Sequence, residues 1–158
     1  MQFANLPEND FLNYIKTYYD ECRGRFERIE AIAGKWMFRD LLPGMSDFDT
    51  RFIVDDNMQA DDWCEMSEAV GAAHLALCQR YPCWSRNLEH LPGINLTWSE
   101  LASERLYYPE YKQWTFYFTE EPELLSETRA KLSTRKWDEK DENNTRLPDA
   151  PAVPASEA

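Results

Sequence analysis

The stretch that decides the fold is residues 38–54, which reads Phe-Arg-Asp-Leu-Leu-Pro-Gly-Met-Ser-Asp-Phe-Asp-Thr-Arg-Phe-Ile-Val. Its Pro43-Gly44 pair predicts a turn, and the residues that follow alternate as they do in a strand. One face of this strand carries Phe48, Thr50, Phe52 and Val54, and the other carries Asp47, Asp49 and Arg51. We therefore expect a buried strand that begins with two carboxylates on one face.

The two carboxylates need a positive partner. Same-face neighbours on a strand lie roughly 6.5–7 Å apart, so Asp47 and Asp49 can converge on one cation. Carboxylates that begin a buried strand are costly to desolvate unless a positive charge meets them. Mg²⁺ prefers carboxylate oxygens and leaves coordination positions open for phosphates. The sequence therefore predicts a Mg²⁺ site with Asp47 and Asp49 as its ligands.

The string Gly44-x-Ser46-Asp47-x-Asp49 ahead of a hydrophobic strand resembles the metal-binding signature of the nucleotidyltransferase superfamily, which has the DNA polymerase β-like fold. The signature consists of a hydrophobic residue, Gly-Ser, a short loop often containing another glycine, and Asp-x-Asp on the second strand. Phe38 matches the hydrophobic position and Gly44 the loop glycine, whereas 39–40, Arg-Asp, stands where the family carries Gly-Ser.

The resemblance implies an α/β fold, with a minimal nucleotidyltransferase-like mixed sheet and helices packed mainly on one face. It also implies Mg²⁺-dependent transfer of a nucleoside monophosphate from a nucleoside triphosphate to a hydroxyl of a small molecule or a protein. The catalytic residues would be Asp47, Asp49 and, as a third carboxylate, Glu89. The nucleotide-binding residues would be Arg39, Gly44, Ser46 and Arg51. Since the chain is short, a protein partner that completes the site is compatible with this interpretation.

Three alternatives stay open from the residues alone. The first is a catalytically degenerate module of the same fold that works by protein contacts. The second is a glycosyltransferase-like Asp-x-Asp site that binds a sugar nucleotide through Mn²⁺. In the third, which is purely structural, Asp47 caps a loop and Asp49 pairs with Arg39 or Arg51.

Composition limits the class of protein. The chain has 158 residues, a net charge of −12 and a pI near 4.6, which argues against non-specific nucleic-acid binding. We expect one domain over 1–135 and a disordered tail over 136–158, no membrane segment, and a cytoplasmic location. The four cysteines are expected to be reduced thiols. A zinc set formed by His74, Cys78, Cys83 and His90 is disfavoured by its spacing.

The hydrophobic pattern predicts the remaining elements. We expect helices over 5–33, from 61 or 62 to 81, from a Thr97–Glu100 capping box to 106, and over 122–132, with strands over 35–42, 84–91, 94–98 and 107–119. In the last strand Trp114, Phe116 and Phe118 are expected to share one core-facing side.

Overall fold

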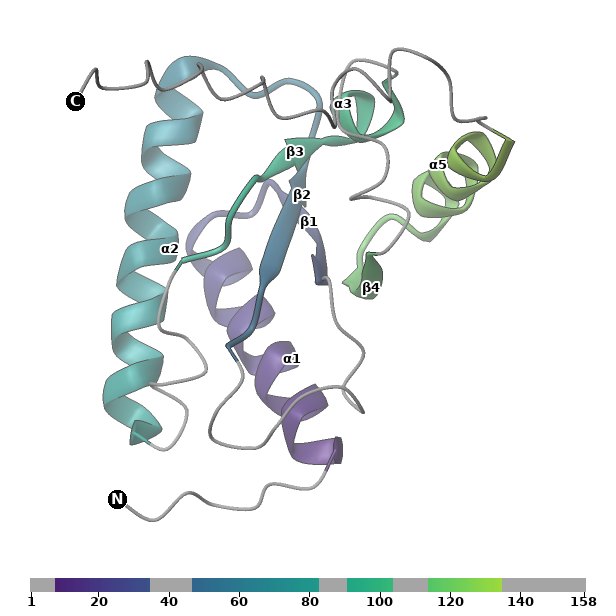
Figure 1. Cartoon of the computed structure of the whole chain (residues 1–158). Helices are drawn as coiled ribbons and strands as arrows, with labels where there is room; N and C mark the ends of the chain where they lie inside the picture. The colour runs from purple at the N-terminus through teal and green to yellow at the C-terminus, as the bar shows by residue number, and fades with distance from the viewer. Residues whose placement is uncertain (1–7, 35–46, 83–90, 104–113, 135–158) are drawn as a thin grey trace, which may run out of the picture.

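The computed structural model describes residues 8–34, 47–82, 91–103 and 114–134. Its helices and strands, drawn in Figure 1, follow one another as α1 (Glu8–Arg25), β1 (Ile29–Gly34), β2 (Thr50–Val54), α2 (Ala60–Arg80), β3 (Leu96–Thr97), α3 (Trp98–Ala102), β4 (Thr115–Thr119) and α5 (Pro122–Thr134).

The four strands form one mixed sheet in the order β3-β2-β1-β4. Strand β1 is antiparallel to both of its neighbours, and β2 pairs with β3 in parallel. The register places Gly34, the last residue of β1, opposite Thr50, the first residue of β2. The predicted α/β class with a mixed sheet is therefore confirmed.

Helices cover both faces of the sheet, and the two longest lie on the same face (Figure 1). The larger hydrophobic core joins α1 and α2 to Ile29, Ile32, Phe52 and Val54 of the sheet. The smaller core lies on the opposite face, where α3 and α5 pack with Ala31, Ala33 and Ile53. Strand β1 therefore contributes buried side chains to both cores.

The alternation predicted around β2 is confirmed by burial. Phe48, Phe52 and Val54 belong to the core beneath α1 and α2, while Ile53 belongs to the core on the other face. The ring of Phe48 meets the ring of Phe11 edge to face, with centroids 5.7 Å apart. This contact fixes the segment before β2 against α1.

The predicted helix over 5–33 is wrong in its last third. Helix α1 ends at Arg25, and Ile29–Gly34 forms β1, the central strand. A strand that is buried on both faces needs apolar residues at successive positions, as 31–33, Ala-Ile-Ala, provides. Such a run also fits helical spacing, so the helical pattern extended across the true boundary.

The prediction that Trp114, Phe116 and Phe118 share one face is also wrong. Trp114 and Phe116 pack with the smaller core, whereas Phe118 packs with the larger one and lies against Tyr19. The register of β4 against β1 shifts between Ile32 and Ala33, and this irregularity breaks the strict alternation.

Several local predictions are confirmed. Helix α2 begins and ends within two residues of the predicted bounds, and Thr97 and Glu100 form the predicted capping box at the start of α3. The helix after that box is shorter than predicted, because it ends at Ala102 and Ser103 is its C-cap. The predicted strand over 94–98 is also too long, because β3 covers Leu96–Thr97 and Trp98 begins α3. The predicted strand over 35–42, all but the last residue of the predicted strand over 84–91, the first part of 107–119, and the tail lie outside the described residues.

Candidate functional site

The two carboxylates of the Asp-x-Asp string lie just before β2, and neither lies within the strand. Phe48 O accepts a hydrogen bond from Thr50 N at 2.8 Å, so the backbone turns at Asp49 before the strand begins. Phe48 is buried between two partly exposed residues, Asp47 and Asp49. This tight turn separates the two carboxylates by a core aromatic side chain and leaves both of them within reach of solvent.

Asp49 is paired with Arg51, as one of the structural alternatives predicted. Arg51 Nη1 donates to Asp49 Oδ1 at 2.5 Å and to the carbonyl oxygen of Thr50 at 2.8 Å. The side chain of Arg51 is only 9% exposed, whereas that of Asp49 is 23% exposed. A guanidinium buried to this extent requires a carboxylate beside it, so the pair is a structural unit of the site.

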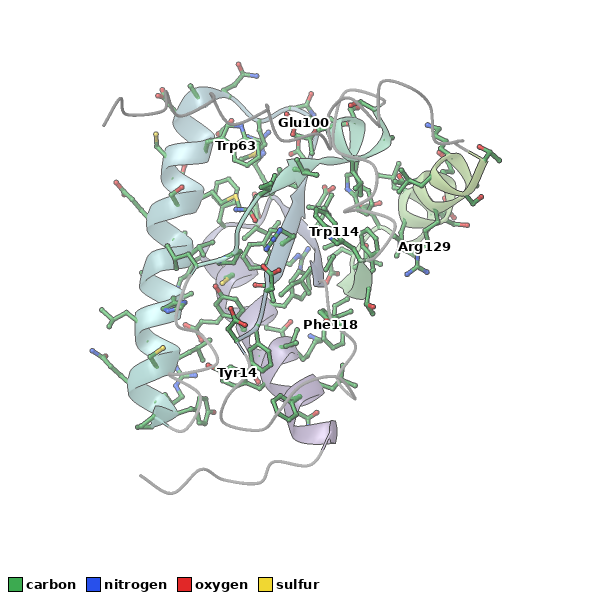
Figure 2. The ribbon with its side chains drawn as sticks, viewed as in Figure 1. Tyr14, Trp63, Glu100, Trp114, Phe118 and Arg129 are labelled. Carbon is green, nitrogen blue, oxygen red and sulfur yellow. The ribbon has the colours of Figure 1, made fainter. Side chains whose placement is uncertain are left out.

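Two residues distant in sequence hold the Arg51 guanidinium in place. A Cβ added to Gly93 would lie 2.7 Å from Arg51 Nη1 and 2.9 Å from its Cζ, so the guanidinium packs directly on the Gly93 backbone. Gly93 N also donates to Thr50 O at 3.1 Å. The Cζ of Arg51 lies 5.9 Å from the ring centroid of Trp114, a cation–π distance. Figure 2 labels Trp114 on the side of the sheet that faces α3 and α5.

The last residue of β1, Gly34, lies beside the first residue of β2, Thr50, and therefore close to the Asp49–Arg51 pair. Gly34 is packed under Tyr117, because a Cβ there would lie 2.7 Å from both Cε2 and Oη of that ring. Burial raises the pKa of Tyr117 to about 12, and the negative charge of Asp49 adds to this rise. The tyrosine therefore keeps its proton at neutral pH and presents a neutral hydroxyl beside the end of β1.

The structure brings together part of the predicted site. Asp47, Asp49 and Arg51 lie at the start of β2, while Arg39, Gly44, Ser46 and Glu89 lie outside the described residues. Among the described residues, His, Cys, Asp and Glu side chains form no group of three or more that could hold a metal ion. Residues 91–97, Leu-Pro-Gly-Ile-Asn-Leu-Thr, lead into β3 and contain no carboxylate.

Sequence reasoning missed Gly34, Gly93, Trp114 and Tyr117 as neighbours of this site. Trp114 and Tyr117 belong to the segment that pairs with β1, and no local pattern indicates which strand that segment will join. The Pro92-Gly93 pair is typical of a turn. Gly93 also has a second role: because it lacks a Cβ, the guanidinium of Arg51 can pack on its backbone. This contact joins residues 42 positions apart in the chain, so no local pattern indicates it.

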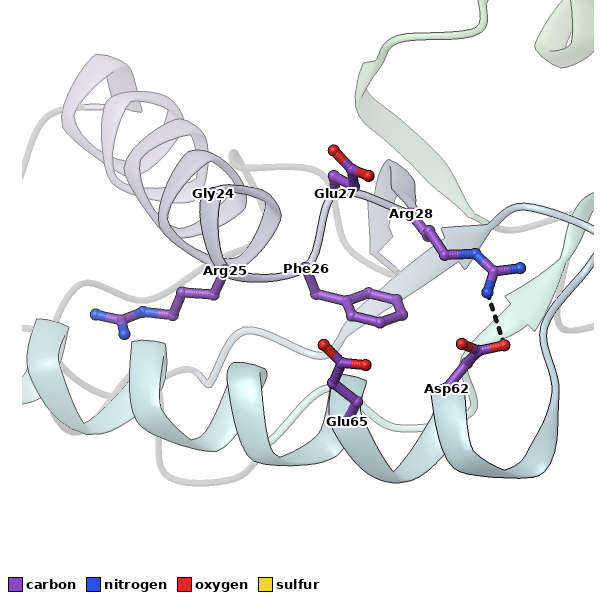
Figure 3. Close-up of a pocket in the computed structure, with 7 residues that line it drawn as sticks. All are labelled: Gly24, Arg25, Phe26, Glu27, Arg28, Asp62 and Glu65. Atoms are coloured by element: carbon purple, nitrogen blue, oxygen red, sulfur yellow. Dashed lines mark ion pairs between the residues drawn. The ribbon is translucent and has the colours of Figure 1, made fainter.

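A second charged cluster lies at the other end of β2, around a pocket of about 380 Å³ (Figure 3). Arg28 binds Asp55 through two hydrogen bonds and lies 2.6 Å from Asp62. The hydrogen bonds from Arg28 lower the pKa of Asp55 to about 2, and the pKa of Asp62 is lowered too, first by the backbone N–H of Gln59 and then by Arg28. Because the two carboxylates share one guanidinium, this cluster closes the corner between β1 and α2.

The cysteine and histidine side chains form no metal site in the described part of the chain. Cys22, Cys64 and Cys78 are unpaired thiols, and burial raises the pKa of Cys22 to about 12, which keeps it protonated and unreactive. His74 contacts the ring of Tyr18, while Cys83 and His90 lie outside the described residues. Across the described ranges, we find no helix that is long and apolar enough to span a membrane.

Comparisons of this chain with known protein families, with curated proteins and with solved structures find no match.

Proposed function

We propose that this chain is a Mg²⁺-dependent nucleotidyltransferase, with the start of β2 and the end of β1 as its nucleotide site. The observation that carries the proposal is the pairing of Gly34 with Thr50, the residue directly after Asp49. The resembled signature places a glycine at the end of one strand and Asp-x-Asp at the start of the next. The β1–β2 hairpin has this order.

The position of Gly34 changes the alignment with that signature. Ala33 and Gly34 end β1, and they match the hydrophobic residue and the glycine of the signature. Residues 38–40, Phe-Arg-Asp, match the hydrophobic residue but contain no glycine. Lys35 then stands where the signature has serine, and Gly44 keeps the place of the loop glycine. This alignment restores a glycine at the strand end, and it supports the proposal more strongly than the sequence pattern did.

The donor groups suit a hard cation. Asp47 and Asp49 offer carboxylate oxygens, the ligands that Mg²⁺ prefers, and both are partly exposed. Oδ1 of Asp49 is bound to Arg51, while Oδ2 accepts no hydrogen bond from the residues that the structure describes. When bound, the ion would neutralise charge that develops on the phosphates.

The side chains of this chain would then orient the reactants. Arg51 would donate hydrogen bonds to phosphate oxygens, and the resemblance assigns the same role to Arg39 and to the backbone N–H groups of Gly44 and Ser46. Glu89, as a third carboxylate, would accept the proton of the acceptor hydroxyl. The hydroxyl oxygen would attack the α-phosphorus of the nucleotide, and pyrophosphate would leave.

Calorimetry with Mg²⁺-ATP and Mg²⁺-CTP tests the proposal. We expect wild type to release or absorb heat with at least one nucleotide, and Asp47→Asn to lose most of that binding. Asp20→Asn is a matched control, because Asp20 is an exposed residue of α1 that pairs with Lys16. Pyrophosphate release in the presence of hydroxyl-bearing acceptors would then test the transfer step.

The degenerate interaction module is a second candidate, and the Asp49–Arg51 pair favours it. This pair already engages Oδ1 of Asp49, and the described residues form no group of three or more His, Cys, Asp or Glu side chains that could hold a metal ion. A folded wild-type protein that gives no heat with either nucleotide would support the module and exclude the enzyme.

A further inference from the structure

We propose that the hydrogen bond between Trp98 and Glu30 is a pH-sensitive latch, which holds α3 against the sheet more firmly when Glu30 carries a proton. The latch does not depend on the proposed function, because it lies beside the end of β2 and the candidate nucleotide site lies at the start of that strand. Glu30 is the only charged residue of β1, and the other five residues of the strand are buried. A charged side chain in such a strand calls for a specific explanation.

The bond joins the first residue of α3 to the central strand of the sheet. Trp98 Nε1 donates to Glu30 Oε2 at 2.7 Å, and the indole ring, which is 4% exposed, belongs to the smaller core. In the described part of the chain, no other side chain donates a hydrogen bond to this half-buried carboxylate. One donor compensates only part of the cost of removing a carboxylate from water, so Glu30 gains from a proton that neutralises it.

A second carboxylate holds the next residue of α3. Ser99 donates from its N and its Oγ to the two carboxylate oxygens of Asp56, at 2.7 Å each. Because Trp98 and Ser99 are consecutive, their bonds bring the carboxylates of Glu30 and Asp56 to the same end of the helix. Two negative charges that repel each other therefore fasten α3 to the sheet.

Two further carboxylates act on Glu30 from neighbouring segments. Glu120 N donates to the backbone oxygen of Glu30 at 2.8 Å, so Glu121, the next residue, also lies beside the start of β1. Asp55 N donates to the backbone oxygen of Arg28 at 3.2 Å, two residues before Glu30. The guanidinium of Arg28 already binds two carboxylates, and it forms no ion pair with Glu30.

The other carboxylates of the adjoining segments have partners of their own. The side chain of Glu100 in α3 accepts a hydrogen bond from Thr97 N at 2.9 Å, and that of Glu120 lies near Tyr19 and Arg23. The protonation state of Glu30 is therefore set mainly by burial, by the Trp98 bond and by its three carboxylate neighbours.

These influences together raise the pKa of Glu30. Burial raises it most, Glu121, Asp55 and Asp56 raise it further, and the bond from Trp98 lowers it without cancelling the rise. A carboxyl group whose pKa is raised by folding adds stability below its unfolded pKa, and this stability is lost as the pH rises through the folded-state pKa. Because undocking of α3 would return Glu30 to water, α3 should open less often near pH 5 than at pH 8.

Amide hydrogen exchange of the full chain, corrected for the intrinsic rate at each pH, tests the latch. In wild type, the protection of the α3 amides should rise severalfold relative to that of the α2 amides as the pH falls from 8 to 5. Glu30→Gln keeps an oxygen that accepts from Trp98 but has no charge. Its α3 amides should be as protected at pH 8 as those of wild type at pH 5, and its Tm at pH 8 should be about 2–4 °C higher than that of wild type.

Two more variants make the test specific. Glu121→Gln leaves the latch intact and removes one repelling charge, so it should raise the protection of α3 at pH 8 by a smaller factor than Glu30→Gln does. Glu68→Gln makes the same change of charge at an exposed position of α2, and its exchange profile should match that of wild type.

Two results would overturn the inference. One is a protection of α3 in wild type that does not depend on pH, and the other is the same pH dependence in wild type and Glu30→Gln. If Glu30→Gln does not fold, Glu121→Gln decides in its place, and a profile identical to that of Glu68→Gln would reject the latch.

Discussion

Arg28 joins the first two strands of the sheet through Asp55. Its Nε and Nη2 donate to Oδ2 and Oδ1 of that carboxylate at 2.8 and 3.1 Å, and its Nη1 lies 2.6 Å from Asp62. One guanidinium thus connects the residue before β1, the residue after β2 and the first turn of α2. Strand β2 is therefore bounded by an Asp–Arg pair at each end, a structural one here and the candidate site at the other.

The Arg28–Asp55 pair predicts acid sensitivity. The pKa of Asp55 is lowered from 3.8 to about 2, so its contribution to stability is complete above pH 4 and is lost as the pH falls toward 2. We expect the free energy of unfolding to decline across this window in wild type and to decline less in Asp55→Asn. Urea unfolding at pH 5, 4, 3 and 2 measures the difference.

At neutral pH, Asp55→Asn should cost about 1 kcal/mol, since a quarter of the side chain is exposed and water screens the pair. Asp20→Asn, on the exposed face of α1, is the control and should change stability little. Parallel pH profiles for wild type and Asp55→Asn would contradict the assignment.

Substitution by alanine should have opposite effects on stability at two glycines, Gly34 and Gly71. Gly34→Ala should destabilise the protein by about 1–3 kcal/mol, because the new methyl group at the end of β1 would lie 2.7 Å from Tyr117. Gly71→Ala should stabilise it by about 1 kcal/mol, because an added Cβ in the interior of α2 meets nothing within 4 Å. Thermal unfolding of both variants beside wild type decides this, and a shift of the same sign in both would refute the packing at Gly34.

Thr97 should matter for the start of α3. Its Oγ1 accepts a hydrogen bond from Glu100 N at 3.1 Å, and Glu100 returns one to Thr97 N at 2.9 Å. We expect Thr97→Ala to lower the free energy of unfolding by about 1 kcal/mol, the usual cost of an N-cap. Thr97→Ser keeps the hydroxyl and should recover most of the loss in chemical denaturation. An equal loss in both variants would mean that the methyl group, and not the cap, is what stabilises the position.

The sequence was informative wherever a structural rule is local. The alternation at Phe52, the length of α2 and the box at Thr97 depend on residues within one or two turns, and all three were predicted. The helical pattern failed at Ile29, because a central strand buried on both faces has no alternation to distinguish it. The surroundings of Arg51 were beyond prediction, because Gly93 and Trp114 reach it only through strand order, which no local pattern encodes.

The Asp49–Arg51 pair predicts that loss of either partner costs more than loss of both. Asp49→Asn leaves a guanidinium that is 91% buried without its carboxylate, and Arg51→Gln leaves Asp49 without its donor. The double variant removes both charges, so we expect it to be about 2 kcal/mol more stable than the sum of the single effects implies. Urea unfolding of the four proteins completes this double-mutant cycle, and strictly additive effects would show that the pair contributes nothing.

A large coupling would also mean that Asp49→Asn perturbs folding as well as ligand binding. Asp47→Asn is therefore the better variant for testing nucleotide binding, because it keeps both partners of the Asp49–Arg51 pair.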